Sequence, residues 1–395
     1  MPLIQEIEQE KESIIQLRRH FHSNPELSML EHKTAVQIEN TLDKYGISHT
    51  RIGTTGVLGI IKGSLQGERI VALRADTDAL PITELRDTPY RSTVSGVMHA
   101  CGHDAHTACL LGAAQYLSSH TDSFGGEIRL IFQPGEEIGK GAKDFIKANA
   151  LAGVQRVLGI HTASNLPSGV IAVKSGLNNA AVDYFKIHIE GKAAHVSTPE
   201  LGADALYIAS QVVVAVQALI TRRLSPTDPV IIGIGSFQSG TAYNIVASEA
   251  YLEGTTRTTS LETRQWARDQ ITQTVAAIAA IYGGKGSVEW VDIAPPVIND
   301  ATVSKEVATV ASRLWSDRKV VTDRALSLGG DNFAEFELEA PGAYAMLGTA
   351  TPDNPHTSLP AHNGGFDIDE NALTTGASLY AGYALYYLKG GIDFD

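Results

Sequence analysis

The chain has 395 residues, a formal net charge of −13 at pH 7 and 43% hydrophobic residues. Nucleic acid and anionic membrane surfaces bind basic patches, and the sequence contains no long run of Lys or Arg, so we expect neither as a partner. A single hydrophobic core usually stops growing at about 250 to 300 residues, so the length favours two domains.

Signals for export or membrane insertion are not expected in this sequence. Residues 1–21 are amphipathic and highly charged, without the apolar core of a signal peptide. No stretch approaches the roughly 18 continuous apolar residues of a membrane span. Cys101 and Cys109 lie where a predicted helix would turn them in different directions, so we expect no disulfide and a cytoplasmic protein.

The first half of the chain predicts alternating helices and strands. Apolar residues at helical spacing indicate a helix over 4–21, and a second helix should end at Gly46. Short apolar runs indicate strands of a buried, largely parallel sheet, with helices between them, at 70–73, 128–132 and 157–160 and at 105–117 and 142–150. We therefore expect an α/β domain with a mostly parallel sheet and helices on both faces.

A different pattern begins after residue 178. The segments read as strand, helix, two strands, helix and strand, at 183–191, 204–220, 230–240, 249–258, 263–282 and 286–296. This order describes a self-contained α+β unit. We expect residues 1–182 and 296–395 to form one domain and residues 183–295 to form a smaller inserted domain.

Polar side chains follow each predicted strand of the first domain. Asp78 comes after the first strand, Glu136 and Glu137 after the second, and His161 after the third. Ligands of open α/β sheets bind outside the carboxyl ends of the strands. These side chains should therefore converge on one rim of the sheet.

The segment 98–106, MHACGHDAH, contains one thiol and three imidazoles. Cys101 and His103 are two residues apart, which on an extended segment or tight loop turns both toward the same side, where one cation could bind both. His362 lies in a Pro/Gly/Asn-rich stretch that could return to the rim. With Glu136 and Glu137, these residues indicate a metal centre and a catalytic base. The structural alternatives are a buried small hydrophobe for Cys101 and a solvated helix start for the glutamates.

Eight motifs, in order, resemble the M20 metallopeptidase family, in its amidohydrolase branch of aminoacylase-like, hippurate hydrolase-like and auxin-conjugate hydrolase-like enzymes. They cover roughly residues 18–387 and read LRRHFHSNPELSMLEHKTA, ALRADTDALPI, MHACGHDAHTA, FQPGEEIGKGAKDFI, VLGIH, IEGKAAHVSTPELGADA, GTAYNIVASEAYLEGTTRT and AHNGGFDIDE.

The resemblance implies two divalent metal ions in each subunit, bridged by the Cys101 thiolate. The first ion would also bind His103 and His161, and the second Glu137 and His362. A thiolate, three imidazoles and a carboxylate suit Zn²⁺ best, and Mn²⁺, Co²⁺ or Ni²⁺ could occupy such sites according to availability.

The resemblance also implies roles beyond metal binding. Glu136 would be the general acid/base for a metal-activated water, and Asp78 would orient a metal ligand. In the inserted domain, which would serve as lid and dimerisation domain, His195 would polarise the scissile carbonyl, in one arrangement across the interface of a homodimer. Asn244 and Arg257 would anchor the free carboxylate of the substrate.

We therefore expect a metal-dependent hydrolase that cleaves the amide bond of an N-acyl-L-amino acid and acts on small molecules. The alternatives are a dipeptidase or carboxypeptidase of the same family, a cysteine hydrolase with Cys101 as nucleophile, and a non-catalytic binding protein. Two motifs depart from the family pattern and bear on substrate preference: 244–248 reads NIVAS where relatives usually have NVIPD, and 330–333 reads GDNF where they usually have SEDF.

Overall fold

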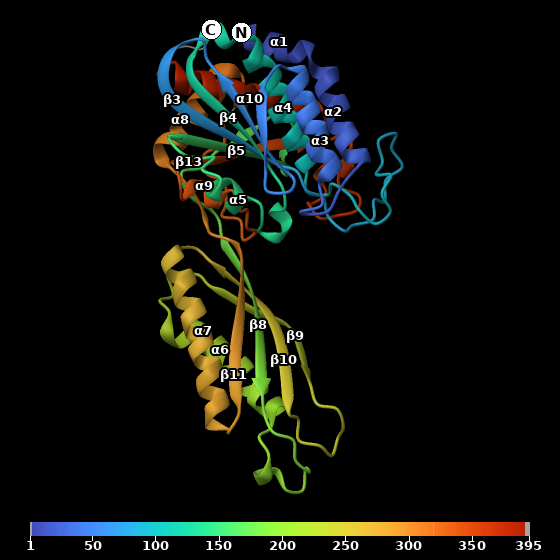
Figure 1. The fold of residues 1–395 in the computed structure, drawn as a ribbon, viewed down its shortest axis with the longest axis vertical. Coiled ribbons are helices and arrows are strands. Elements are labelled where there is room, and N and C mark those ends of the chain that lie inside the picture. Colours follow the sequence, from blue (N-terminus) through green and yellow to red (C-terminus); the bar gives the residue numbers. More distant parts are fainter. Residues whose placement is uncertain (1, 319, 392–395) are drawn as a thin grey trace. The chain divides into compact units, whose positions relative to one another are not determined.

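A computed structural model describes residues 2–318 and 320–391. The chain folds into two compact units (Figure 1). The larger unit comprises Met1–Asn178, Ile298–Ala325 and Asp331–Asp395, and the smaller unit comprises Asn179–Val297 and Leu326–Gly330. The short segment Leu326–Gly330, which belongs to the smaller unit, is a feature that the sequence patterns do not predict.

The larger unit is built on a seven-stranded sheet. The strands in spatial order are β1 Ser48–Ile52, β2 Gly56–Lys62, β4 Gly125–Gln133, β3 Leu65–Asp76, β5 Arg156–Pro167, β13 Gly342–Ala350 and β6 Ile171–Ala172. The four central strands β4, β3, β5 and β13 are parallel, whereas β1, β2 and β6 pair antiparallel with their neighbours. The predicted mostly parallel sheet is confirmed. The carboxyl-terminal halves of β3 and β4 and most of β13 are buried, as a sheet covered on both faces requires.

Helices of the larger unit cover both faces of this sheet. They are α1 Pro2–Gln9, α2 Lys11–Ser23, α3 His32–Lys44, α4 His103–Ser119, α5 Ala142–Lys147, α8 Ala301–Leu314, α9 Ala334–Glu337 and α10 Ala372–Leu388. The prediction of a single helix over 4–21 is wrong. The segment forms α1 and α2, which are separated at Glu10, where ψ is 3°. Leu3, Ile7 and Ile14 are buried on both sides of the break, so the apolar spacing continues across it and conceals it.

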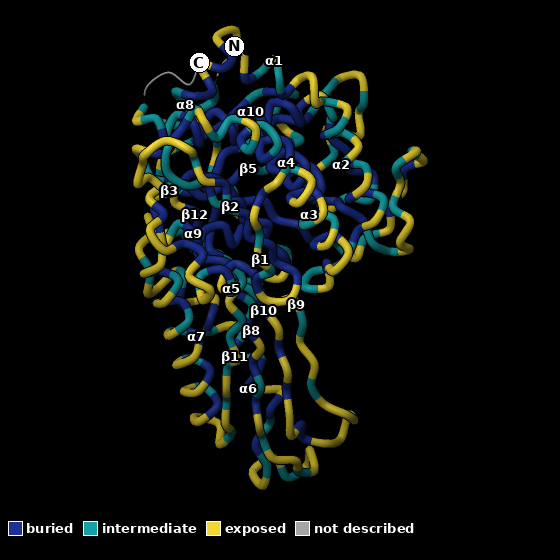
Figure 2. Tube along the Cα trace, turned by 45° about the horizontal axis from the view of Figure 1, so that its top comes forward, coloured by how far each residue is buried: buried dark blue, intermediate teal, exposed yellow. Residues whose placement is uncertain are grey.

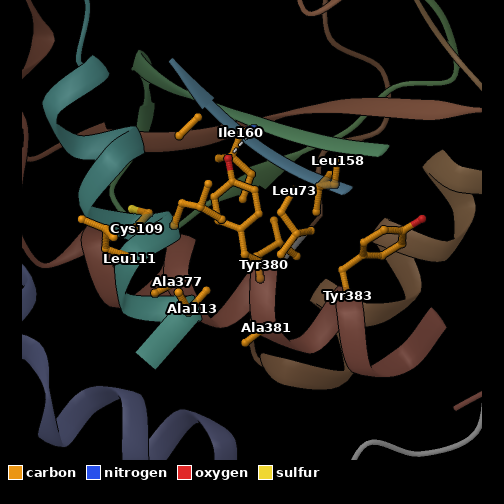
Figure 3. Packing of buried hydrophobic residues seen from close by; sticks show 14 of the residues in the cluster. Leu73, Cys109, Leu111, Ala113, Leu158, Ile160, Ala377, Tyr380, Ala381 and Tyr383 are labelled. Carbon is orange, nitrogen blue, oxygen red and sulfur yellow. Dashed lines mark hydrogen bonds between the residues drawn. The ribbon is translucent and has the colours of Figure 1, made fainter. Parts of the chain in front are cut away.

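Strand β5 packs against α4 and α10 on one face of the sheet and against the Phe333 ring on the other. Leu158 and Ile160 point into the core beside α4 and α10 (Figure 3), where the Tyr380 hydroxyl accepts the Ile160 N–H at 3.1 Å. Between them, Gly159 faces the opposite side, where an added Cβ would lie 2.8 Å from the Phe333 ring. Strand alternation thus places successive residues of β5 in two different layers.

The smaller unit is an antiparallel sheet with two helices. Its strands in spatial order are β11 Lys285–Ala294, β8 Ala181–Glu190, β10 Glu249–Thr258 and β9 Ile231–Ser239, and its helices are α6 Ala205–Arg223 and α7 Leu261–Ile281. The short strands β7 Gly176–Asn179 and β12 Val297–Asn299 pair with each other. The strand and helix order is the one the sequence predicts, and an alternating burial pattern on β8 reflects its single buried face. The edge strand β9 is largely unburied (Figure 2).

Helix α6 is the one described helix whose length and composition would suffice to cross a membrane. Its residues Ile208, Val212 and Val216 are buried in the core of the smaller unit. A core helix passes the same test of length and composition, so this property is weak support for a membrane span.

Candidate metal centre

The carboxyl ends of three parallel strands supply most of the predicted site. Asp76 ends β3 and Asp78 follows it, and Gln133 ends β4 two residues before the turn that leads to Glu136 and Glu137. His161 lies on β5, beside the ends of the other two strands. His103 begins α4 directly after Gly102, whose φ of 93° reverses the chain there.

The five predicted ligands fall into two groups that share Cys101. The ligand atoms of Cys101, His103 and His161 lie within 4.8 Å of one another, and so do those of Cys101, Glu137 and His362. The Cys101 Sγ is 3.5 Å from His161 Nε2, and His362 Nε2 is 3.3 Å from Glu137 Oε2. A shared thiolate with two further donors on each side is an arrangement suited to a pair of cations.

Hydrogen bonds at Nδ1 leave Nε2 of His103 and of His161 available as metal ligands. His103 Nδ1 donates to the backbone oxygen and Oδ1 of Asp78 at 2.9 and 3.2 Å, and His161 Nδ1 donates to the Thr162 carbonyl at 2.7 Å. In the neutral rings, Nε2 is then the unprotonated nitrogen. His103 Nε2 and Glu137 Oε1 are buried, 3.8 Å apart, and without a hydrogen-bond partner among the described residues. Two buried atoms with lone pairs and no hydrogen-bond partner are suited to bind divalent metal ions.

The electrostatics of the site also favour cations. Burial and the negative charge of Glu137 raise the pKa of the Cys101 thiol well above its usual range. A divalent cation beside the sulfur would favour the thiolate and reverse this effect. Burial lowers the pKa of His161, which keeps its ring neutral and able to act as a ligand.

Glu136 lies beside the predicted ligands without completing either group that contains Cys101. Its carboxylate forms a further group with His103 and Glu137, all within 4.8 Å. Burial and the negative charges of Asp331 and Glu137 raise its pKa well above the ordinary value. The Asn332 N–H lies 3.4 Å from its Oε1. A carboxyl group in this position can exchange a proton with a molecule held at the centre.

Asp78 holds both a predicted ligand and the turn that carries the two glutamates. Besides its contacts with His103, it accepts the N–H groups of Glu136 and Glu137 at 3.1 Å each. Burial would raise the pKa of Asp78, but the hydrogen bonds donated by His103 and Ser28 act against burial, and the pKa is lowered. The carboxylate is therefore an acceptor fixed in place.

His106 lies beside the site but has both ring nitrogens occupied. Its Nε2 accepts the Thr162 N–H at 2.9 Å, so its Nδ1 donates to Asp76 Oδ1 at 2.5 Å. In the group formed by Asp76, His103 and His106, whose ligand atoms lie within 4.8 Å of one another, Asp76 and His106 are thus already hydrogen-bonded to each other.

Sequence patterns did not identify the ion pairs beneath Glu136. The buried guanidinium of Arg74 lies 2.8 Å from Asp76 and 3.2 Å from Asp331. Asn332 donates to the Lys140 carbonyl at 2.7 Å. Arg74 lies near the end of β3, and Asp331 lies in the segment 330–333 that departs from the family pattern. A charged residue in either place is the sequence signal that could have identified them.

The three predicted substrate residues belong to the smaller unit and lie in two places. His195 forms a β-bridge with Ile245, and the Asn244 carbonyl accepts the N–H of Val196 at 3.2 Å, so His195 and Asn244 are neighbours. Arg257 is at the other end of β10. At roughly 3.3 Å per residue, the strand separates it from the Asn244 end by more than about 25 Å.

Arg257 is held in place by oxygen atoms of its own unit. Its Nε donates to the Leu328 carbonyl at 3.0 Å, and its Nη1 donates to the Thr255 hydroxyl and the Thr256 carbonyl at 2.6 and 2.9 Å. Among the described residues no carboxylate forms an ion pair with it, and burial lowers its pKa. It lines a pocket whose walls include Ile231. This cation is therefore positioned and free to bind an anion.

Comparisons with known proteins show which family and which proteins the chain is similar to. Residues 72–386 match the model of peptidase family M20/M25/M40. The chain is 40% identical to thermostable carboxypeptidase 2 of Saccharolobus solfataricus over 95% of each chain, and 38% identical to N-acetyl-L-cysteine deacetylase of Bacillus subtilis over 95% of this chain and 87% of the other. A dinuclear metal-binding peptidase of the M20 family from Bacillus subtilis superposes with a TM-score of 0.82 at 34% identity, covering 97% of this chain and 99% of the other. The chain therefore belongs to peptidase family M20/M25/M40 and is a metal-dependent hydrolase.

Proposed function

We propose that the enzyme hydrolyses the amide bond of N-acyl-L-amino acids, releasing the acyl group as a carboxylic acid and the free amino acid. The observation that carries the proposal is Glu136 beside two donor groups that share Cys101. The similarity to a deacetylase of an N-acetylated amino acid supports the substrate class.

The residues divide the reaction between them. Two bound divalent ions, Zn²⁺ in our proposal and Mn²⁺, Co²⁺ or Ni²⁺ as substitutes, would lower the pKa of water and polarise the carbonyl. Glu136 takes the proton of the attacking water and returns it to the amide nitrogen, so that the C–N bond breaks and a neutral amine leaves. Asp78 holds His103 and the N–H groups of the glutamate turn throughout.

His195 is suited to donate a hydrogen bond to the substrate carbonyl. The Ser197 N–H lies 3.1 Å from His195 Nδ1 and must donate to it, so the neutral ring carries its proton on Nε2. An Nε2–H group can stabilise the oxyanion that forms when water adds to the carbonyl. Arg257 would bind the α-carboxylate of a substrate, and Asn244 would assist through its side-chain amide.

Removal of metal should abolish turnover of N-acetyl- and N-benzoyl-amino acids, and addition of Zn²⁺ or Mn²⁺ should restore it. The measurement is amino acid release after dialysis against a chelator. Amides of the same substrates, which lack the α-carboxylate, should react about 10- to 100-fold more slowly because they cannot pair with Arg257. Full activity of the metal-free protein would refute the mechanism, and alkylation-sensitive activity without metal would indicate a Cys101 nucleophile instead.

A carboxypeptidase or dipeptidase is the second candidate, supported by the similarity to thermostable carboxypeptidase 2. The same residues would cleave a peptide bond, since only the group on the acyl side differs. A panel of acetyl, benzoyl and aminoacyl substrates separates the two functions. A higher kcat/KM for aminoacyl substrates would favour the second.

We further propose a homodimer of this predicted cytoplasmic enzyme, formed through the smaller unit, in which His195 serves the partner's site. A small acylated amino acid is much shorter than the distance between the two ends of β10, so it cannot contact His195 and Arg257 of one chain together. The largely unburied edge strand β9 offers a surface for pairing between copies.

A mixture of two inactive variants tests this arrangement. When Glu136→Gln and His195→Ala chains are co-expressed, the mixture should recover about a quarter of wild-type activity, because about half of the dimers are mixed and each mixed dimer has one of its two sites intact. Steady-state assays of the mixture and of each variant alone measure the recovery. If His195 acts within its own chain, the mixture should be as inactive as its components.

A further inference from the structure

A buried carboxylate outside the predicted site holds the turn that carries the two glutamates. Glu31 precedes α3 and is 0% exposed. Its Oε1 accepts the N–H groups of Met29 at 2.8 Å and Gly135 at 2.9 Å, and its Oε2 accepts the Thr55 hydroxyl at 2.7 Å. One side chain therefore joins three segments that are far apart in the sequence.

Two residues with left-handed backbone conformation meet at this carboxylate. Gly135 has a φ of 66°, and a Cβ there would lie 2.7 Å from the Met29 sulfur. Met29 itself has a φ of 65°, which is unfavourable for a residue other than glycine. Such strain persists only where surrounding contacts impose it, and it is common at functional sites. Glu31 provides one such contact to each residue.

The hydrogen bonds of the turn form a continuous series. Three successive N–H groups, those of Gly135, Glu136 and Glu137, are donated to carboxylates, the first to Glu31 and the next two to Asp78. The segment of Glu31 contacts Asp78 as well, because the Ser28 hydroxyl donates to it at 2.6 Å. The loop before α3 thus supplies one acceptor of the turn, Glu31, and donates a hydrogen bond to the other acceptor, Asp78.

We propose that Glu31 is a positioning residue for Glu136 and Glu137, acting through the Gly135 N–H. This inference rests on the proposed metal-dependent function. Without the Glu31 acceptor, the turn can relax, and the Glu137 carboxylate moves relative to Cys101 and His362. Residues that orient metal ligands typically change metal affinity or activity by about 10- to 100-fold when they are lost.

The test compares Glu31→Met with Glu31→Gln. Glutamine keeps one oxygen for both N–H groups and can donate its amide to the Thr55 hydroxyl, whereas methionine has a similar length and accepts none of these bonds. We expect Glu31→Met to raise the Kd for Zn²⁺ about 10- to 100-fold, measured by competition with a chromogenic chelator, and to lower kcat. Glu31→Gln should restore both values to near wild type.

Glu26 provides a matched control in the same segment. Its Oε2 accepts the Thr34 N–H at 2.8 Å and the Thr34 hydroxyl at 3.0 Å, without contact to the turn. Glu26→Met should therefore destabilise the fold while leaving the Kd for Zn²⁺ unchanged. If Glu31→Met fails to fold, Thr55→Val, which removes only one hydroxyl, should raise the Kd about fivefold.

The outcomes separate this inference from the proposed function. Wild-type Zn²⁺ affinity in a folded Glu31→Met, or equal losses in Glu31→Gln and Glu31→Met, would overturn the positioning role. An unchanged Kd in Thr55→Val, where that variant is needed, would also overturn it. Failure of the wild-type protein to bind Zn²⁺ or to cleave any acylated amino acid would instead overturn the proposed function.

Discussion

Replacing Glu136 by glutamine should lower kcat by about 100- to 10,000-fold while the protein keeps its metal. Glutamine preserves the shape of the side chain but cannot take a proton from water or return one to the leaving nitrogen. Glu136 lies close to the site, in a group with His103 and Glu137, yet belongs to neither group that contains Cys101. Steady-state kinetics and elemental analysis of one preparation measure both parts of the expectation.

The neighbouring residue supplies the control. Glu137 belongs to the group with Cys101 and His362, so Glu137→Gln should lower metal affinity as well as activity. The two variants should therefore differ in metal content: Glu136→Gln keeps its metal and loses turnover, whereas Glu137→Gln loses both. A Glu136→Gln enzyme that works at the wild-type rate would exclude Glu136 as the general base, and a metal-depleted one would make it a ligand.

Replacing Arg18 by methionine should lower the free energy of unfolding by about 3 to 5 kcal/mol. Arg18 is fully buried on α2 and lies 2.8 Å from Asp104, 3.2 Å from Asp367 and 3.3 Å from Glu370. The variant leaves Asp104 and Asp367 buried with one cation fewer. Urea unfolding followed by circular dichroism measures the loss.

Arg19 is a matched control on the same helix. It also pairs with Glu370, at 2.6 Å, but its side chain is 37% exposed. Solvent screens such a pair, so Arg19→Met should cost about 1 kcal/mol or less. Equal losses in the two variants would mean that burial of the Arg18 charge does not determine its contribution to stability.

The effect of Arg18→Met should depend on pH. Burial raises the pKa of Asp104, but the charges of Arg18 and His22 outweigh burial and hold it well below its usual range. A carboxylate with a depressed pKa in the folded state stabilises the protein above its unfolded pKa of about 3.9, and that contribution is lost as pH falls through the folded value. The difference between wild type and variant should therefore shrink below about pH 4. A difference that is constant down to pH 2 would contradict the assignment.

Positions defined by local chemistry could be read from the sequence. Buried strands at 128–132 and 157–160 are apolar runs, and parallel strands present their carboxyl ends at one rim. The pattern therefore predicts that Glu137 and His161 lie on the same rim, where each belongs to a group that contains Cys101. The alternating and helical segments of the smaller unit predict its α+β order for the same reason, because side-chain periodicity reflects which face is buried. The family resemblance supplied the pairing of ligands into two groups, which spacing alone left open.

The remaining features depend on contacts between distant segments, which carry no local signal. The break at Glu10 lies within continuous apolar spacing, and the burial of Arg18 depends on Asp104 and Asp367, far along the chain. Glu31 shows the same limit, because a glutamate before a helix is usually solvated and only the fold brings the Gly135 N–H to it.

The sequence by itself determined the enzyme family, the α/β architecture and the residue types able to bind metal, because motifs and periodicity are local properties of the chain. Only the tertiary structure decided which lone pairs remain free at His103 and Glu137 and which buried charges hold the site together. It also separated His195 from Arg257 along β10. Those features depend on distances and hydrogen bonds that exist only after folding brings remote residues together.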